Sequence, residues 1–431
     1  MAKIFVYDEF APEDIAMMQA LYSRSPKSVT EHVEQVKQTG SGKFMERFYV
    51  GYGHASIADC GSTTIFIEGI SILGDKAIQD WPFYSGQETS TRYVDMAKRP
   101  IVDPIGTGAS KKILDKWMAF YAENLPLMER FLTGKYPKKE SDDENVYKKA
   151  IKARAFDILR AFLPAGITTQ LSWHTNLRQA WDKLSILRYH PLDEVRTTAE
   201  SILAKLKEKY PHSFSHRPTE EQESYREYAG KNYFLFNPPK EEVVEFSLKT
   251  DIKKEELEKY KDITENRPPR TGLPIFLFEL GILTFDLILD YGSFRDLHRH
   301  RNGICRVPLL RTDIGFNPWY LEELPADIKE KALKLIEEQK ETITKLNAPP
   351  EILQYYIALG FNVPCHITYG LPATVYVVEL RCGKMVHPTL RKIAFKMREA
   401  LLDRFPNLKM NCDLEPSEWD VSRGLQDIIK K

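Results

Sequence analysis

Two short segments of the chain alternate partly between apolar and polar residues in steps of two. They are residues 62–71 (STTIFIEGIS) and 282–290 (ILTFDLILD), and both are rich in residues with high strand propensity. This pattern predicts a β-strand in each place. Each segment is followed by a sequence that predicts a helix, KAIQDW at 76–81 and GSFRDLHRHR at 292–301.

The most apolar stretch of the chain, residues 274–292, is interrupted by Glu279, Asp286 and Asp290. A membrane-spanning helix needs a longer uncharged segment. The stretch therefore predicts a buried sheet or core helix.

A second pair of similar segments begins at residues 187 and 380. Each reads Leu-Arg, then His-Pro, then an amphipathic helix that ends at an aromatic-proline pair. Together with the two strand-helix pairs, this order predicts two copies of one unit, residues 1–217 and 218–431. The boundary lies near SFSHRPTEEQES (213–224), where proline and charged residues replace the apolar pattern.

The charge balance limits the classes of partner. Sixty-one Lys and Arg residues balance sixty-one Asp and Glu residues, so a chain-wide attraction to nucleic acid polymers or anionic membranes is not expected. Asp8 and Glu9 interrupt the N-terminal sequence before an apolar segment of signal-peptide length can form, so export is not expected. Five cysteines without a CxxC pair favour reduced thiols in the cytoplasm and make a zinc site improbable, so no metal is expected.

The first copy resembles the flavin-dependent thymidylate synthases. The resemblance rests on APEDIAMMQALYSRS, GHASIADC, FIEGIS, SGQETSTRYVD, RAFLP and TNLRQAWDKLSILR, which occur in the family's order over most of residues 1–217. The family signature is Arg-His-Arg followed, after about seven residues, by Ser-x-Arg. The first copy has Asp-Trp-Pro at 80–82 but keeps the following loop, whereas the second keeps Arg299-His300-Arg301 but retains only Arg311 of its loop.

This division of the signature suggests one composite site. Active sites in the family form between subunits, so the fusion of two copies leaves one site free to degenerate. The resemblance implies an α+β fold of two related domains, each an antiparallel sheet with a helical bundle, joined as an intrachain pseudo-dimer. A homodimer of tandem chains would rebuild the family's tetramer.

The resemblance also implies the reaction and its residues. The reaction is methylation of deoxyuridylate (dUMP) to thymidylate, with FAD as cofactor, methylenetetrahydrofolate as carbon donor and NADPH as reductant. The implied catalytic residue is Arg188. The implied substrate-binding residues are Gln87, Glu88, Ser90, Thr91, Arg92, Arg160 and Arg299, and the implied flavin-binding residues are Ser56, Glu88, Asn176, Asp182, Arg299, His300 and Arg301.

Arginines suit the three anionic groups that must converge in such a pocket, namely reduced flavin, its pyrophosphate and the nucleotide phosphate. Guanidinium groups are permanently charged and donate several hydrogen bonds in one plane. The family's catalytic arginine stabilises the uracil imide as its anion. A well-placed cation lowers a neighbouring pKa by about one to three units, roughly 1.4 to 4 kcal/mol.

Three positions depart from the family pattern. Thr91 replaces a glycine and adds a side chain where a phosphate would approach. Asp296 replaces a glutamine, and its carboxylate would repel an anionic substrate unless it pairs with an arginine. Asp182 replaces an asparagine of the flavin-contacting helix.

Other interpretations stay open at this stage. The charged residues 298–301 also fit a solvent-exposed helix face. Pro364-Cys365-His366 resembles the nucleophile segment of the unrelated classical thymidylate synthases, although it corresponds to a core helix in the flavin family, which favours a structural cysteine. A flavin- or nucleotide-binding pseudoenzyme, a uridylate methylase and a hydroxymethylase are the remaining alternatives.

Overall fold

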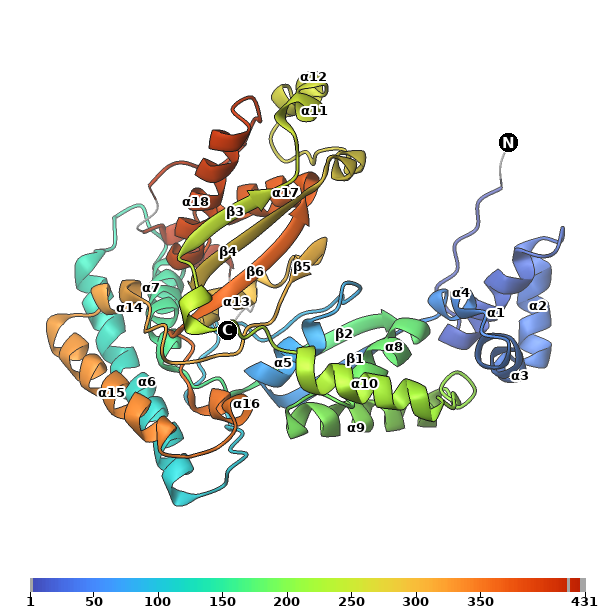
Figure 1. Cartoon of the computed structure of the whole chain (residues 1–431), viewed down its shortest axis with the longest axis horizontal. Helices are drawn as coiled ribbons and strands as arrows, with labels where there is room; N and C mark the ends of the chain where they lie inside the picture. The colour runs from blue at the N-terminus through green and yellow to red at the C-terminus, as the bar shows by residue number, and fades with distance from the viewer. Residues whose placement is uncertain (1–2, 417–418, 427–431) are drawn as a thin grey trace. The chain divides into compact units, whose positions relative to one another are not determined.

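The computed structural model describes residues 3–416 and 419–426. Its packing divides the chain into two compact units (Figure 1). Unit 1 contains the chain up to Ile70 together with Ala77–Glu88 and Gln170–Phe234, and unit 2 contains Ser71–Lys76, Thr89–Thr169 and the chain from Leu235 onward. The units therefore interleave along the sequence, and the repeat boundary near residue 217 stays a prediction.

The elements follow the same order in the two halves of the chain. The first half contains α1 (Pro12–Tyr22), α2 (Val29–Thr39), α3 (Gly42–Phe44), the π-helix η1 (Met45–Gly51), α4 (Ala55–Asp59), β1 (Ser62–Ser71), α5 (Ile72–Gln79), α6 (Gly108–Lys135), α7 (Glu144–Leu159), η2 (Arg160–Phe162), β2 (Thr168–Asn176), α8 (Leu177–Leu187) and α9 (Asp193–Lys209).

The second half begins with α10 (Glu220–Tyr233), η3 (Lys240–Glu242), β3 (Phe246–Thr250), α11 (Lys254–Glu258), α12 (Lys261–Glu265), η4 (Ile275–Leu280), β4 (Ile282–Asp290), α13 (Tyr291–Leu297) and β5 (Gly303–Cys305). It continues with α14 (Pro318–Glu322), α15 (Ala326–Thr344), α16 (Pro350–Leu353), η5 (Gln354–Tyr356), β6 (Asn362–Gly370), α17 (Leu371–Arg381), α18 (Pro388–Arg404) and η6 (Val421–Gln426). The shared order β1-α5-α6-β2-α8-α9 and β4-α13-α15-β6-α17-α18 confirms the α+β fold with two related halves.

Unit 2 contains a four-stranded antiparallel sheet in the order β3-β4-β6-β5. Leu283, Phe285, Leu287 and Leu289 of β4 are buried at alternate positions, as the two-residue pattern predicts. Cys365 lies in β6, opposite Leu287. The expectation of a core helix at this cysteine is therefore wrong, and the β-branched residues around it are better suited to a strand.

Corresponding segments of the two halves pair with each other inside unit 2. The amide of Ala165 donates to the carbonyl of Ile357 at 2.9 Å, and the amide of Gly360 donates to the carbonyl of Ala161 at 2.8 Å. Gly360 is needed here because a Cβ atom on it would lie 2.8 Å from the Cβ of Ala161. The long helices α6 and α15 also meet, and Gln339 Nε2 donates to the carbonyl of Ile113 at 2.8 Å.

In unit 1, β1 and β2 form a two-stranded sheet, and α8 and α9 follow β2. Helices α1 and α2 pack through a small core of Met17, Met18, Val33 and Val36. Among residues 3–416 and 419–426, no helix is long and apolar enough to cross a membrane.

Candidate functional site

A group of arginines surrounds Asp296 in unit 2. Arg299 Nε lies 3.8 Å from one carboxylate oxygen of Asp296, and Arg160 Nη1 lies 3.9 Å from the other. Arg381 donates a hydrogen bond to the main-chain oxygen of Asp296. Burial alone would raise the pKa of the Asp296 carboxyl, but these arginines and Arg92 outweigh burial and hold the pKa well below its ordinary value.

The helix α13 that follows β4 carries Asp296, and the residues after this helix include Arg299. Asp290 is the last residue of β4 and the N-cap of α13, where its carboxylate accepts a hydrogen bond from the amide of Ser293 at 2.8 Å. Helix α13 ends at Leu297. The helix predicted over 292–301 is therefore shorter than expected, and Arg299, His300 and Arg301 follow it in a turn, where Arg301 donates to the carbonyl of Arg299 at 2.9 Å.

Arg92 is bound by a carboxylate that sequence reasoning missed. Its Nε lies 2.7 Å from Asp157 Oδ1, and its Nη2 lies 3.2 Å from Oδ2. Arg423 of η6 contacts the same carboxylate. The Asp157 side chain is fully buried, which would raise its pKa, but the two guanidinium groups lower the pKa well below the ordinary range.

Loop residues beside Arg92 complete this arrangement. The Ser90 hydroxyl accepts a hydrogen bond from the amide of Arg92 at 3.2 Å. Thr91 is buried, and its hydroxyl accepts a hydrogen bond from Arg295 Nη1 at 3.2 Å. The threonine that replaces the family's glycine therefore anchors the loop to α13.

Arg160 lies between these groups and is almost completely buried. Its Nη2 donates to the Ser293 hydroxyl at 2.9 Å, and that hydroxyl lies 2.7 Å from the hydroxyl of Thr389. The Nε of Arg160 has no hydrogen-bond partner among the described residues. His387 lies 3.2 Å from the main-chain oxygen of Asp157, and burial lowers the pKa of this imidazole well below its ordinary value.

Arg381 is a candidate site residue that was missed from the sequence. Its Nε donates to Nε2 of His300 at 2.9 Å, so this ring nitrogen acts as an acceptor. Burial, and then the charge of Arg381, lower the pKa of His300 to about 3. The repeat could have identified Arg381, because Leu380-Arg381 corresponds to Leu187-Arg188.

The folded protein is expected to lose stability at acidic pH, because His300 takes up a proton more readily in the unfolded chain than in the folded protein. The pKa of His300 is lower in the folded state than the ordinary value of about 6.5. The stability that neutral His300 contributes is therefore fully present above about pH 6.5 and decreases as the pH falls toward 3. The loss approaches about 1.4 kcal/mol per pH unit for one proton. Denaturant unfolding of wild type and His300→Gln between pH 7 and pH 5 measures this, and equal pH slopes in the two proteins would contradict it.

The predicted residues fall into two groups. Ser90, Thr91, Arg92, Arg160, Arg299, His300 and Arg301 belong to unit 2, and Ser56, Gln87, Glu88, Asn176, Asp182 and Arg188 belong to unit 1. The structure thus brings the Arg92 loop and the Arg299 turn together inside one unit.

The unit 1 residues have local partners. Arg188 Nη1 lies 3.5 Å from Glu223 Oε2. Asn176 caps α8 by accepting a hydrogen bond from the amide of Gln179 at 2.8 Å. Burial raises the pKa of the half-buried Asp182, although the charge of Arg178 opposes the shift.

The other three unit 1 residues lie near β2 or α4. Glu88 accepts a hydrogen bond from Gln79, and Gln87 pairs with Ser172 of β2 through its main chain. Ser56 is exposed in α4, where its carbonyl accepts a weak hydrogen bond from the Cys60 thiol at 3.5 Å.

Cys365 is poorly suited to nucleophilic attack. The side chain is buried in β6, and burial raises the pKa of its thiol well above the ordinary value. A reactive cysteine needs the opposite shift, because the thiolate is the nucleophile. This environment favours the structural role for Cys365.

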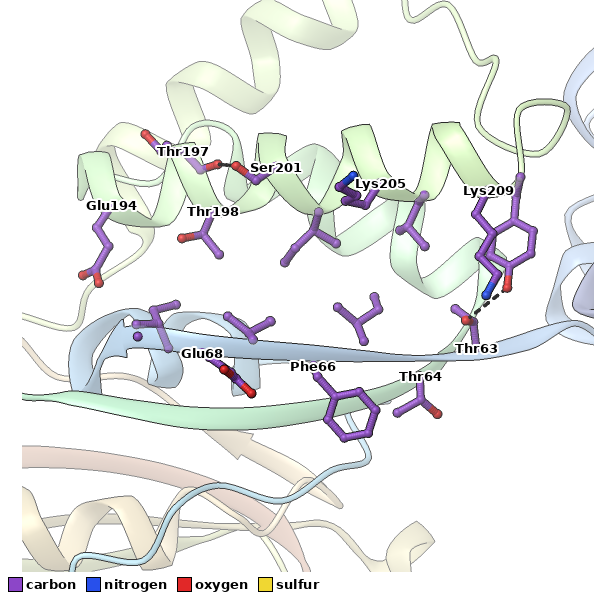
Figure 2. A pocket seen from close by; sticks show the side chains of 17 residues that line it. Thr63, Thr64, Phe66, Glu68, Glu194, Thr197, Thr198, Ser201, Lys205 and Lys209 are labelled. Carbon is purple, nitrogen blue, oxygen red and sulfur yellow. Dashed lines mark hydrogen bonds between the residues drawn. The ribbon is translucent and has the colours of Figure 1, made fainter. Parts of the chain in front are cut away.

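A groove of about 550 Å³ lies elsewhere, between β1 and α9 of unit 1 (Figure 2). Thr198 and Lys205 of α9 line one side, and the strand lines the other (Figure 2). The charged groups that line it are Glu68, Glu194, Lys205 and Lys209. Two carboxylates and two amines give no cationic surplus, so this groove is not suited to a polyanionic ligand as the arginine group of unit 2 is.

Comparisons with known proteins place the chain among relatives of similar organisation. The model of a family described as thymidylate synthase complementing protein matches residues 6–212. A UPF0159 protein of Thermoplasma acidophilum is 24% identical over 92% of this chain and 94% of its own length. UPF0159 proteins of Chlamydia pneumoniae and Chlamydia muridarum are 24% and 25% identical over 90% of this chain and 83% and 84% of their lengths. These relatives therefore align with both halves.

Proposed function

We propose that this chain, whose residues 6–212 match the model of the family described as thymidylate synthase complementing protein, methylates deoxyuridylate at one composite site in unit 2. The single observation that carries the proposal is that Arg160 from the first half and Arg299 from the second half both lie within 4 Å of the same carboxylate, at 3.9 Å and 3.8 Å from the two oxygens of Asp296. Methylenetetrahydrofolate is the proposed carbon donor, FAD the cofactor and NADPH the reductant.

The residues present fit an anionic flavin and a nucleotide phosphate. Arg92 and Arg423 share Asp157, and Arg160, Arg299 and Arg381 surround Asp296. More guanidinium groups than carboxylates therefore gather here, and the buried Nε of Arg160 still lacks a partner among the described residues. Such a surplus in a region of low dielectric attracts anions strongly.

The residues of this chain have separate roles in the proposed site. Arg299, with two-fifths of its side chain exposed, reaches the bound anions, while Arg92 holds the nucleotide. Arg381 is oriented by His300 and stabilises the uracil imide as its anion, which raises the electron density on the ring carbon to be methylated. Bound FAD, once reduced by NADPH, would supply the hydride.

A binding protein without catalysis is the second candidate. It is favoured by one observation: Asp157 already occupies the guanidinium of Arg92 with two hydrogen bonds. A nucleotide would then bind next to a paired arginine instead of an unpaired one. Uridylate methylation and hydroxymethyl transfer are further variants of the proposed reaction.

Two measurements on the purified protein test the proposal. We expect flavin absorbance, and tritium release from deoxyuridylate labelled at the reactive ring carbon when methylenetetrahydrofolate and NADPH are present. Because one composite site needs both halves, Arg92→Ala and Arg299→Ala should each lower tritium release at least a hundredfold. The exposed Arg404→Ala is the control.

The outcomes separate the candidates. Bound flavin without tritium release would identify the binding protein. Absence of flavin, nucleotide binding and tritium release together would contradict the proposed function. Full activity in either arginine variant would contradict a single composite site.

A further inference from the structure

The segment Val421–Gln426 (η6) is attached to the region of Arg92. Gly424 lies against the main-chain oxygen of Val146 in α7, where a Cβ atom would have no room. Tyr93 donates a hydrogen bond from its hydroxyl to Gln426 Oε1 at 2.9 Å, and the guanidinium of Arg423 lies 5.7 Å from the centre of the Tyr93 ring. The segment thus contacts both α7 and the residue next to Arg92.

The contact of this segment with Asp157 changes the charge around Arg92, because Asp157 pairs with both Arg92 and Arg423. Asp157 binds Arg92 through two hydrogen bonds and fixes the direction of its guanidinium, but one carboxylate also cancels one positive charge. The second arginine on the same carboxylate, Arg423, restores a net charge of one. With Arg423 in place, the group of Arg92, Asp157 and Arg423 therefore keeps one net positive charge while the guanidinium of Arg92 stays oriented.

We propose that Arg423 is a positioning residue for nucleotide binding: it acts through Asp157 so that Arg92 stays fixed while the site stays cationic toward the nucleotide phosphate. The inference rests on the proposed function and deepens it, because it makes the C-terminal segment part of the binding site. Arg423 need not touch the nucleotide. Its side chain is about nine-tenths buried and lies within the contacts described above.

The charge of Arg423 is the quantity to vary. Arg423→Gln removes the charge and keeps most of the stem, whereas Arg423→Lys keeps the charge. We expect Arg423→Gln to raise the Kd for dUMP, measured by calorimetry, at least tenfold. Arg423→Lys should keep most of the wild-type affinity for dUMP. In turnover, the KM for dUMP should rise by a similar factor while kcat changes less than twofold. Arg404→Gln is the exposed control.

A second variant covers the case in which Arg423→Gln does not fold. Tyr93→Phe removes only the hydrogen bond to Gln426 and loosens the segment without changing the charge. We expect Tyr93→Phe to have a Kd for dUMP that is twofold to fivefold higher than that of wild type, and an unchanged Kd for FAD.

Each outcome decides the inference. If wild type binds dUMP and both Arg423→Gln and Tyr93→Phe bind it equally well, the positioning role is wrong and the proposed function stands. If Arg423→Gln and Arg423→Lys lose affinity equally, a shape role replaces the charge role and the inference is also wrong. If wild-type protein binds neither dUMP nor FAD, the proposed function fails, and the inference fails with it.

Discussion

Arg381→Ala is expected to lower tritium release from labelled deoxyuridylate about 10²–10³-fold, whereas Arg188→Ala is expected to lower it less than tenfold. Loss of one group that stabilises a developing anion has an effect of the first size. Arg381 and Arg188 occupy corresponding Leu-Arg positions of the two halves. Only Arg381 belongs to the group that surrounds Asp296, through its bonds to Asp296 and His300.

The electrostatic role of Arg381 predicts a particular kinetic result. If Arg381 stabilises the uracil anion, kcat should fall at saturating dUMP, and the KM should change little because the phosphate contacts remain. Measurement of both constants in the two alanine variants, with FAD content as a control for folding, checks this. A larger loss of kcat in Arg188→Ala than in Arg381→Ala would contradict this role of Arg381 and would identify Arg188 as the catalytic arginine.

Asp157→Ala is expected to lower the free energy of unfolding by about 3–5 kcal/mol at pH 7. Removal of one partner from a buried ion pair leaves uncompensated buried charge, and here the guanidinium groups of Arg92 and Arg423 both lose their carboxylate. Denaturant unfolding measures the change. Asp115→Asn is the matched control, because Asp115 pairs with Lys111 at the surface, where such a pair contributes about 0.5 kcal/mol or less.

The pH dependence gives this prediction a sign. The pKa of Asp157 is lower in the folded protein than its ordinary value, so the stabilisation is present above the unfolded value of about 3.9 and is lost as the pH falls through the folded pKa. The difference between wild type and Asp157→Ala should therefore be constant from pH 7 to about 5 and should narrow below about 4. A difference under 1 kcal/mol at pH 7 would contradict the structural role of the shared carboxylate.

The strands and the repeat could be predicted from the sequence because their signals are local. The alternation at 62–71 and 282–290 corresponds to β1 and β4 without a shift, and the aromatic-proline pairs follow α9 and α18. The end of α13 at Leu297 was not predicted, because the charged residues after it continue a helix-compatible pattern. The strand at Cys365 was assigned to a helix from the resemblance alone.

The site was predictable in part for a similar reason. The split signature pointed to Arg92 and Arg299, and the resemblance at RAFLP pointed to Arg160. Asp296 lies within 4 Å of Arg160 and Arg299, which meets the condition that this acid pairs with an arginine. Asp157 and Arg423 could not be found in this way. They are separated by 266 positions, and an ion pair across that distance leaves no periodic or motif signal.

The interleaving of the two compact units has a practical consequence for dissecting this protein. A gene cut at residue 217 would separate Thr89–Thr169 from the β4-β6 sheet of unit 2, with which this segment forms one compact body. Neither product would contain a whole folding unit, and each would expose apolar surface that is covered in the intact chain. Complementation between two separately expressed halves would therefore require them to fold together, by co-expression in one cell.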